Sequence, residues 1–160
     1  MLKKTLVAVA GLAIFAGLNA PVAVAQQEND AIEVIRGQIA TKRQALVAQN
    51  MQLTEEQSEK FWPVYREYQF DRTGIVDRRV NTIKNFRDNY QSMTDEQAKK
   101  IIDDVVKYEE DMLKLQKKYI REFRKVLPET QVMRYMQIER KLDATIDFDL
   151  ARVIPLAETE

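Results

Sequence analysis

Apolar side chains recur every three or four residues along most of the chain, which is the spacing of one face of an α-helix. The most regular series runs from Asp95 to Leu127 with near-heptad spacing and predicts one long helix. A second series, from Thr54 to about Asn89, predicts another long helix. Pro63 lies within it and predicts a kink, because proline has no N–H to donate to the turn before it. The apolar positions of the 95–127 series are Ile101, Val105, Tyr108, Met112, Leu115, Tyr119, Phe123 and Val126.

Two shorter apolar series flank the long ones. One begins at a cap, Asn29 or Asp30, and ends near Asn50. The other follows Pro128, whose fixed φ suits a first helical turn, and ends near Arg152. The expected fold class is all-α, with an elongated, four-helix, antiparallel hairpin-type protomer that contains two long helices. The expected organisation is a single helical domain over residues 26–152 and a C-terminal tail over residues 153–160.

The width of one apolar face bears on the oligomeric state. A helix of thirty or more residues extends roughly 50 Å, whereas a globule of this chain length has a radius of gyration of about 14 Å. A layer this thin buries only one side of each helix, so a wide apolar face predicts either a second protomer, which makes the protein a homodimer, or a bound client. Cover by the first and fourth helices is the alternative. The residues that widen this face of the 95–127 helix are Ile102, Val106, Leu113, Ile120 and Leu127.

The first 25 residues have the pattern of a cleavable signal peptide. Lys3 and Lys4 give a positive start, an apolar run follows, and Ala23 and Ala25 are the small residues that signal peptidase accepts at positions −3 and −1. The run is shorter than the roughly 20 residues that a membrane-spanning helix needs. No Cys follows it to carry a lipid anchor. We therefore expect residues 1–25 to be removed and the mature protein to be periplasmic.

Composition narrows the function classes. The 160 residues contain 25 basic and 25 acidic side chains, and neither His nor Cys. The usual proton carriers, nucleophiles and zinc ligands are therefore missing, so we expect no enzyme, no metal site and no cofactor. Export and a charge close to neutral also argue against nucleic acid as a partner.

Three predicted helix starts share a short motif, LTEEQ, MTDEQ and the degenerate LPETQ. In the first two, a Thr hydroxyl can accept a hydrogen bond from the amide three residues on, and the Gln at that position can reach back to the Thr amide. Such a capping box is common in helical proteins and by itself indicates structure rather than activity. The motif residues are Leu53, Thr54 and Gln57; Met93, Thr94 and Gln97; and Leu127 and Gln131.

A leader followed by a helical, Cys-free chain with an LTxxQ pentapeptide at a helix start resembles the Spy/CpxP family of small periplasmic proteins, known for paired LTxxQ motifs. The first motif is intact at Leu53, Thr54 and Gln57, and LPETQ at Leu127 and Gln131 stands in place of the second. The resemblance covers roughly residues 53–142. It implies a cradle-shaped dimer of four-helix protomers that is either an ATP-independent chaperone or an envelope-stress modulator.

Charge and aromatic positions supply the candidate client-binding residues. Residues 95–111 are mainly acidic, and residues 114–141 are mainly basic. The helix dipole accounts for much of this asymmetry, and solvated surface is the alternative for each single residue. Basic side chains with long apolar stems can also hold unfolded chains by weak mixed contacts. The candidates are Trp62, Phe70, Arg78, Arg79, Lys117, Arg121 and Arg124. Phe61, Tyr65 and Tyr68 lie on the apolar stripe and are expected in the core.

Three functions remain open at this point. The first is a chaperone-like protein that binds unfolded or stress-exposed proteins without ATP. The second is a modulator of envelope-stress signalling that docks on one membrane sensor protein. The third is a passive, structural helical protein of the envelope. They differ in whether the protein suppresses aggregation generally, captures one partner, or does neither.

Overall fold

A computed structural model describes residues 41–158, and all the regular structure among them is helical. The chain divides into two units, Met1–Lys42 and Arg43–Glu160, and the account below concerns the second. The predicted signal peptide and the first part of the first predicted helix, up to residue 40, lie outside the described residues. The predicted all-α class is confirmed.

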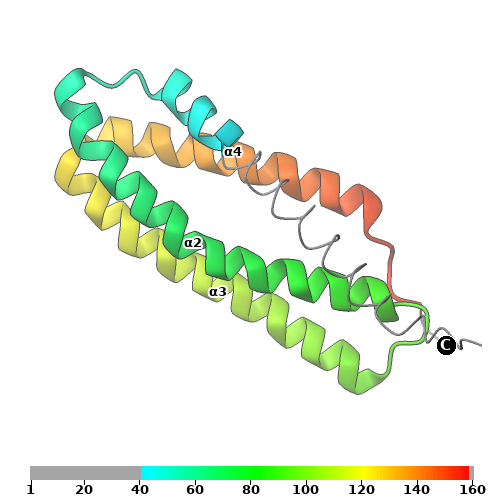
Figure 1. The fold of residues 1–160 in the computed structure, drawn as a ribbon. Coiled ribbons are helices and arrows are strands. Elements are labelled where there is room, and N and C mark those ends of the chain that lie inside the picture. Colours follow the sequence, from blue (N-terminus) through cyan, green and yellow to red (C-terminus); the bar gives the residue numbers. More distant parts are fainter. Residues whose placement is uncertain (1–40, 159–160) are drawn as a thin grey trace, which may run out of the picture. The chain divides into compact units, whose positions relative to one another are not determined.

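Four helical segments make up the described part (Figure 1). The first covers residues 41–51. The others are α2 (Glu55–Asn89), α3 (Asp95–Val126) and α4 (Glu129–Val153). The predicted ends of the two long helices agree with these bounds to within one residue. Pro63 lies inside α2 without ending it.

The two long helices lie side by side and run in opposite directions (Figure 1). Lys118 of α3 pairs with Asp71 of α2 at 2.8 Å, and Asp111, earlier in α3, pairs with Arg78, later in α2, at 2.7 Å. This reversed order of partners is the signature of antiparallel neighbours. The predicted elongated dimer remains a prediction.

Two of the three predicted caps have the expected hydrogen bonds. The amide of Gln57 donates to Thr54 Oγ1 at 3.3 Å, and the Thr54 amide donates to Gln57 Oε1 at 3.0 Å. The Thr94 and Gln97 pair at the start of α3 repeats this arrangement. The degenerate motif differs, because α4 begins at Pro128 without a side-chain cap. Its Gln131 instead donates to Gln57 Oε1 at 3.1 Å, which ties the start of α4 to the start of α2.

An aromatic cluster forms the core where the helices meet. Phe61 of α2, Phe123 of α3 and Tyr135 of α4 are buried, with ring centroids 4.5 Å apart for Phe123 and Tyr135 and 5.4 Å for Phe61 and Phe123. Tyr65 and Tyr68 are buried beside them, as the sequence predicts. Aromatic pairs at these distances gain energy beyond the area that they bury. This cluster is therefore the part of the unit that fixes the three helices against one another.

The 41–51 segment completes this core. Its Val47 and Met51 are buried, and the segment ends where Gln52 takes a left-handed φ of 52°, a common way to end a helix. Arg134 of α4 donates to the backbone carbonyl of Asn50 and so holds the end of the segment to α4. The core thus draws on all four helical segments.

Candidate functional site

Four exposed apolar side chains lie along the first part of α3. We call Ile102, Val105, Val106 and Leu113 the apolar stripe; their exposed fractions range from 45% to 61%. At 100° per residue Ile102, Leu113 and Val106 lie roughly 110–150° from the side of α3 that holds the buried Met112 and Leu115, and Val105 lies about 50° from it. Of the five residues predicted to widen the apolar face, Leu127 is buried and Ile120 is half-buried, whereas Ile102, Val106 and Leu113 are exposed, so the described helices cover only the later part of this face. Contiguous exposed apolar surface of this kind marks an interaction site.

The charges beside the apolar stripe are paired within α3 itself. Lys99 contacts Asp103 at 2.6 Å and Lys100 contacts Asp104 at 2.7 Å, each four residues apart. The hydrogen bond to Asp103 raises the pKa of Lys99. Charges matched in this way leave the apolar side chains as the feature that distinguishes this half of α3.

The second part of α3 exposes mainly basic side chains. We call its six basic residues the basic patch: Lys114, Lys117, Lys118, Arg121, Arg124 and Lys125, all exposed. The one acidic residue among them, Glu122, pairs with Lys125 at 2.6 Å. Lys117 and Arg121 make no ion pair with any residue of the described part. Lys118 pairs with Asp71, and Arg124 pairs with Glu129 at 2.7 Å, so the charge of the basic patch that no described residue pairs lies mainly on Lys117 and Arg121.

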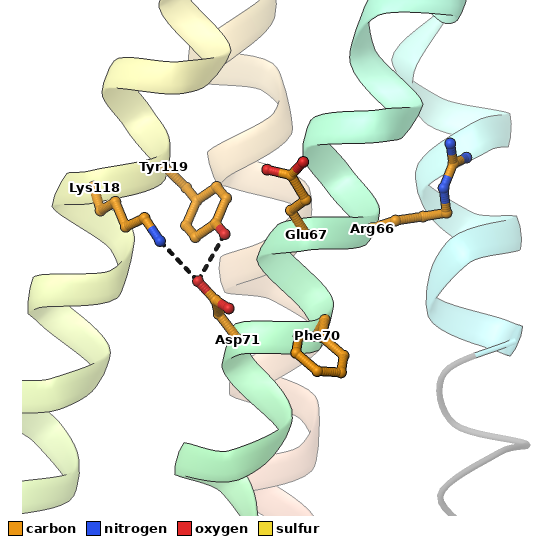
Figure 2. Close-up of a pocket in the computed structure, with 6 residues that line it drawn as sticks. All are labelled: Arg66, Glu67, Phe70, Asp71, Lys118 and Tyr119. Carbon is orange, nitrogen blue, oxygen red and sulfur yellow. Dashed lines mark hydrogen bonds and ion pairs between the residues drawn. The ribbon is translucent and has the colours of Figure 1, made fainter.

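A shallow hollow of about 530 Å³ lies between α2 and α3 beside the basic patch (Figure 2). Asp71 in the hollow accepts hydrogen bonds from Lys118 Nζ at 2.8 Å and from the Tyr119 hydroxyl at 2.7 Å, which lower the pKa of Asp71. Phe70 on its rim is 81% exposed. An exposed aromatic ring beside cations suits weak contacts with a mixed apolar and polar chain. Six residues line the hollow: Arg66, Glu67, Phe70, Asp71, Lys118 and Tyr119.

The seven predicted client-binding residues fall into two groups. Phe70 and three residues of the basic patch, Lys117, Arg121 and Arg124, are exposed. Of these, Arg124 also pairs with Glu129 at 2.7 Å. The remaining three, Trp62, Arg78 and Arg79, make contacts with other helices or turns, although Arg78 is exposed as well. Trp62 is half-buried, and its indole N–H donates to Ser58 Oγ at 2.9 Å. Arg78 pairs with Asp111.

The third of these, Arg79, joins three helices. Its guanidinium pairs with Asp147 of α4 at 2.7 Å and lies 5.1 Å from the ring centre of Tyr108 in α3. A cation over an aromatic ring gains energy in addition to the ion pair. The eight predicted motif residues form helix starts and lie away from the hollow. Arg79 and the motif residues therefore shape the scaffold.

A buried ion-pair network was not predicted from the sequence. Arg43, in the 41–51 segment, is 3% exposed and contacts Glu139 and Asp143 of α4, the latter at 2.7 Å. Arg72 of α2 also contacts Asp143, at 2.7 Å. Burial raises the pKa of Glu139 although Arg43 and Arg72 favour its charged form. The spacing of Glu139 and Asp143, four residues apart and on the same side of α4 as Tyr135, is the only sequence signal of this network.

Within residues 41–158 no group of three His, Cys, Asp or Glu side chains is placed to hold a metal ion. No helix of this part has an apolar stretch that is long enough to cross a bilayer.

The interpretation rests on these surfaces, because comparison with known proteins adds nothing to it. No family model matches this chain, and no curated protein or solved structure matches it either.

Proposed function

We propose that the protein is a periplasmic, ATP-independent, chaperone-like protein that holds partly unfolded proteins on the surface of α3 and the adjoining hollow. The observation that carries the proposal is the apolar stripe, which stays exposed along a helix whose neighbouring charges are paired. The signal-peptide pattern and the resemblance of Leu53, Thr54 and Gln57 to the Spy/CpxP motif support the same function. Those two arguments come from the sequence and are independent of the exposed surface.

The apolar stripe suits weak and reversible binding. Fully burying one aliphatic side chain stabilises a complex by about 1.5–3 kcal/mol, and half-exposed side chains gain proportionally less. Four such side chains therefore supply a few kcal/mol, of which association entropy removes a large share. Phe70, exposed at the rim of the hollow, adds a second apolar contact. Clients would be held long enough to avoid aggregation and then released without an energy source.

The predicted homodimer competes for the same surface. Antiparallel pairing of two α3 helices would set the acidic first half of one against the basic second half of the other, which is favourable. However, the apolar stripe offers on the order of a few hundred Å², and a stable interface buries roughly 800 Å² per partner. A client contact is therefore the better use of the apolar stripe. If a dimer used the apolar stripe, the molar mass would double as the protein concentration rises. Suppression of aggregation would fall over the same range of concentration.

Aggregation suppression tests the proposal directly. The protein is mixed with an unrelated, heat-unfolding protein without ATP, and light scattering is followed. The variant Ile102→Gln with Leu113→Gln removes two apolar side chains that are already exposed, so the fold should persist. It should require on the order of tenfold more protein for equal suppression. The matched control, Met133→Gln with Phe148→Gln, removes two exposed apolar side chains of α4 and should behave like the wild type.

The other two functions predict different results in the same assay. A stress-signalling modulator would suppress little aggregation and would capture one membrane sensor in a periplasmic pull-down. A passive envelope protein would do neither. Absence of suppression by the wild type at several-fold molar excess would therefore contradict the chaperone-like function.

A further inference from the structure

The positive charges of the basic patch repel one another. Basic residues three or four positions apart on a helix are neighbours, and like charges at that spacing destabilise the helix. Arg121 alone has four such neighbours: Lys117, Lys118, Arg124 and Lys125. In the first half of α3, by contrast, the same spacing joins opposite charges. A repulsive cluster on one half of a helix calls for an explanation outside the helix.

The helix dipole explains only part of this cluster. The negative end of the dipole attracts cations in the last turn, which contains Arg124 and Lys125. The effect falls off within that turn, so it does not account for Lys114, Lys117 or Arg121. These three also lack the close acidic partners found elsewhere, since Lys114 lies 4.0 Å from Asp111 and the other two make no ion pair within the described residues.

The cations of the basic patch point away from the protein. Met112, Leu115, Tyr119 and Phe123 are buried and mark the side of α3 that faces the core. At 100° per residue, the patch residues lie more than a quarter of a turn from that side, and Lys117, Arg121 and Lys114 lie almost opposite it. The hollow at Phe70 touches the patch only through Lys118. The patch is therefore an outward-facing strip about 17 Å long, at 1.5 Å per residue from residue 114 to residue 125.

We propose that the basic patch docks the protein on the surface of a bilayer that contains anionic phospholipids, with its Lys and Arg side chains on the lipid phosphates. A straight, outward-facing row of long cations fits a plane of phosphates, and clusters of about four to eight Lys or Arg on a helix are typical of anionic-lipid binding. An extended acidic polypeptide is the competing partner. It would be held better by a groove than by this convex strip.

This docking would be independent of the proposed chaperone-like function. It uses the outward side of the second half of α3, whereas the apolar stripe lies mainly on the first half. A protein held at the membrane in this way keeps the apolar stripe free for clients. The two proposals therefore fail separately, because variants of the apolar stripe should leave membrane binding unchanged, and variants of Lys117 and Arg121 change it.

Vesicle sedimentation tests the proposal. The purified protein is mixed at low salt with vesicles of phosphatidylcholine alone, or of phosphatidylcholine and phosphatidylglycerol in equal parts. It should sediment with the second kind only. Because each Lys or Arg near an anionic surface contributes about a fivefold gain in binding, Lys117→Gln with Arg121→Gln should bind about 30-fold more weakly. Salt at physiological strength should weaken the wild type, since it screens charges beyond about 8 Å.

A matched variant and two probes make the outcome decisive. Lys99→Gln with Lys107→Gln removes the same charge from the first half of α3 and should bind vesicles like the wild type. Inorganic phosphate at millimolar concentration should not displace the protein, because single phosphates cannot span the strip. Equal sedimentation with both kinds of vesicle, an equal loss in the Lys99 and Lys107 variant, or binding to poly-glutamate without binding to anionic vesicles would each overturn the proposal.

Discussion

The two halves of α3 belong to one helix and one apolar series, yet they present different side chains to solvent. In residues 95–111 the three lysines pair with acids of the same helix, and apolar side chains are exposed. In residues 112–126 Met112, Leu115, Tyr119 and Phe123 are buried against the aromatic core, and Lys117 and Arg121 make no ion pair within the described residues. The difference follows from the neighbours of each half, because Tyr135 of α4 packs against Phe123 in the second half, with ring centroids 4.5 Å apart.

This comparison indicates how one helix can provide two kinds of surface. Where a third layer covers the helix, apolar residues are used for stability, and the outward side is free to carry charge. Where no helix of the described residues covers α3, as at Ile102 and Val106, the apolar side chains stay available for a partner. The predictions below test that division, beginning with the half that holds the core.

Truncation of a core aromatic should have the largest effect. Phe123 is 1% exposed and contacts Phe61 and Tyr135, so Phe123→Ala should lower the free energy of unfolding by about 3–5 kcal/mol. Ile102→Ala, in the half with the exposed side chains, should change it by less than about 0.5 kcal/mol, because Ile102 is 61% exposed. Urea denaturation of both variants measures the difference. Equal losses would show that the division between the halves is wrong.

Removal of Arg43 should have the next largest effect. Arg43→Ala leaves the buried Glu139 with less compensation, and the loss of one partner of a buried ion pair costs on the order of 3 kcal/mol. The pKa of Glu139 lies above its usual 4.5, so the folded state binds this proton more tightly than the unfolded state does. For this group, stability is therefore greatest at or below about 4.5 and falls as the pH rises through the raised native pKa.

The pH dependence provides the control for Arg43. Arg43→Ala should raise the native pKa of Glu139 further and widen the range over which stability falls with rising pH. Glu139→Gln should abolish this contribution, since the amide does not titrate in that range. Denaturant unfolding over a series of pH values measures both. A flat profile in the wild type, or one that Glu139→Gln leaves unchanged, would contradict the assignment of this slope to Glu139.

The features that the sequence predicts well are local ones. The starts of α2 and α3 follow from Thr54 with Gln57 and from Thr94 with Gln97, because each capping box involves residues only three apart. The Arg43 network was missed, since its partners are about a hundred residues away in the chain. Periodicity cannot reveal which distant charges will meet.

The candidate surfaces were predicted only in part for a related reason. Phe70, Lys117 and Arg121 lie off the apolar series, and the structure exposes them as that position suggests. Trp62 also lies off the series, but Ser58 one turn earlier and the ring of Phe61 hold it against the core. The exposure of the apolar stripe depends on where α4 runs. The sequence gives the width of the apolar face of α3, and the fold decides which part of it is covered.

The smallest expected effect is the change in stability on reversing one charge of α3. It is the most informative about the two halves of the helix, because its predicted sign differs between them. Lys117→Glu converts two like-charge pairs, with Lys114 and Arg121, into opposite-charge pairs, so it should stabilise the protein by about 0.5–1 kcal/mol. The same variant should bind anionic vesicles far more weakly. In the first half, Lys99→Glu replaces an attraction to Asp103 by a repulsion and should lower stability without affecting vesicle binding. Thermal unfolding and vesicle sedimentation of the two variants give four results, each with a predicted direction. If Lys117→Glu lowered stability, the patch residues would contribute to the fold, and their unpaired charge would need no partner to explain it.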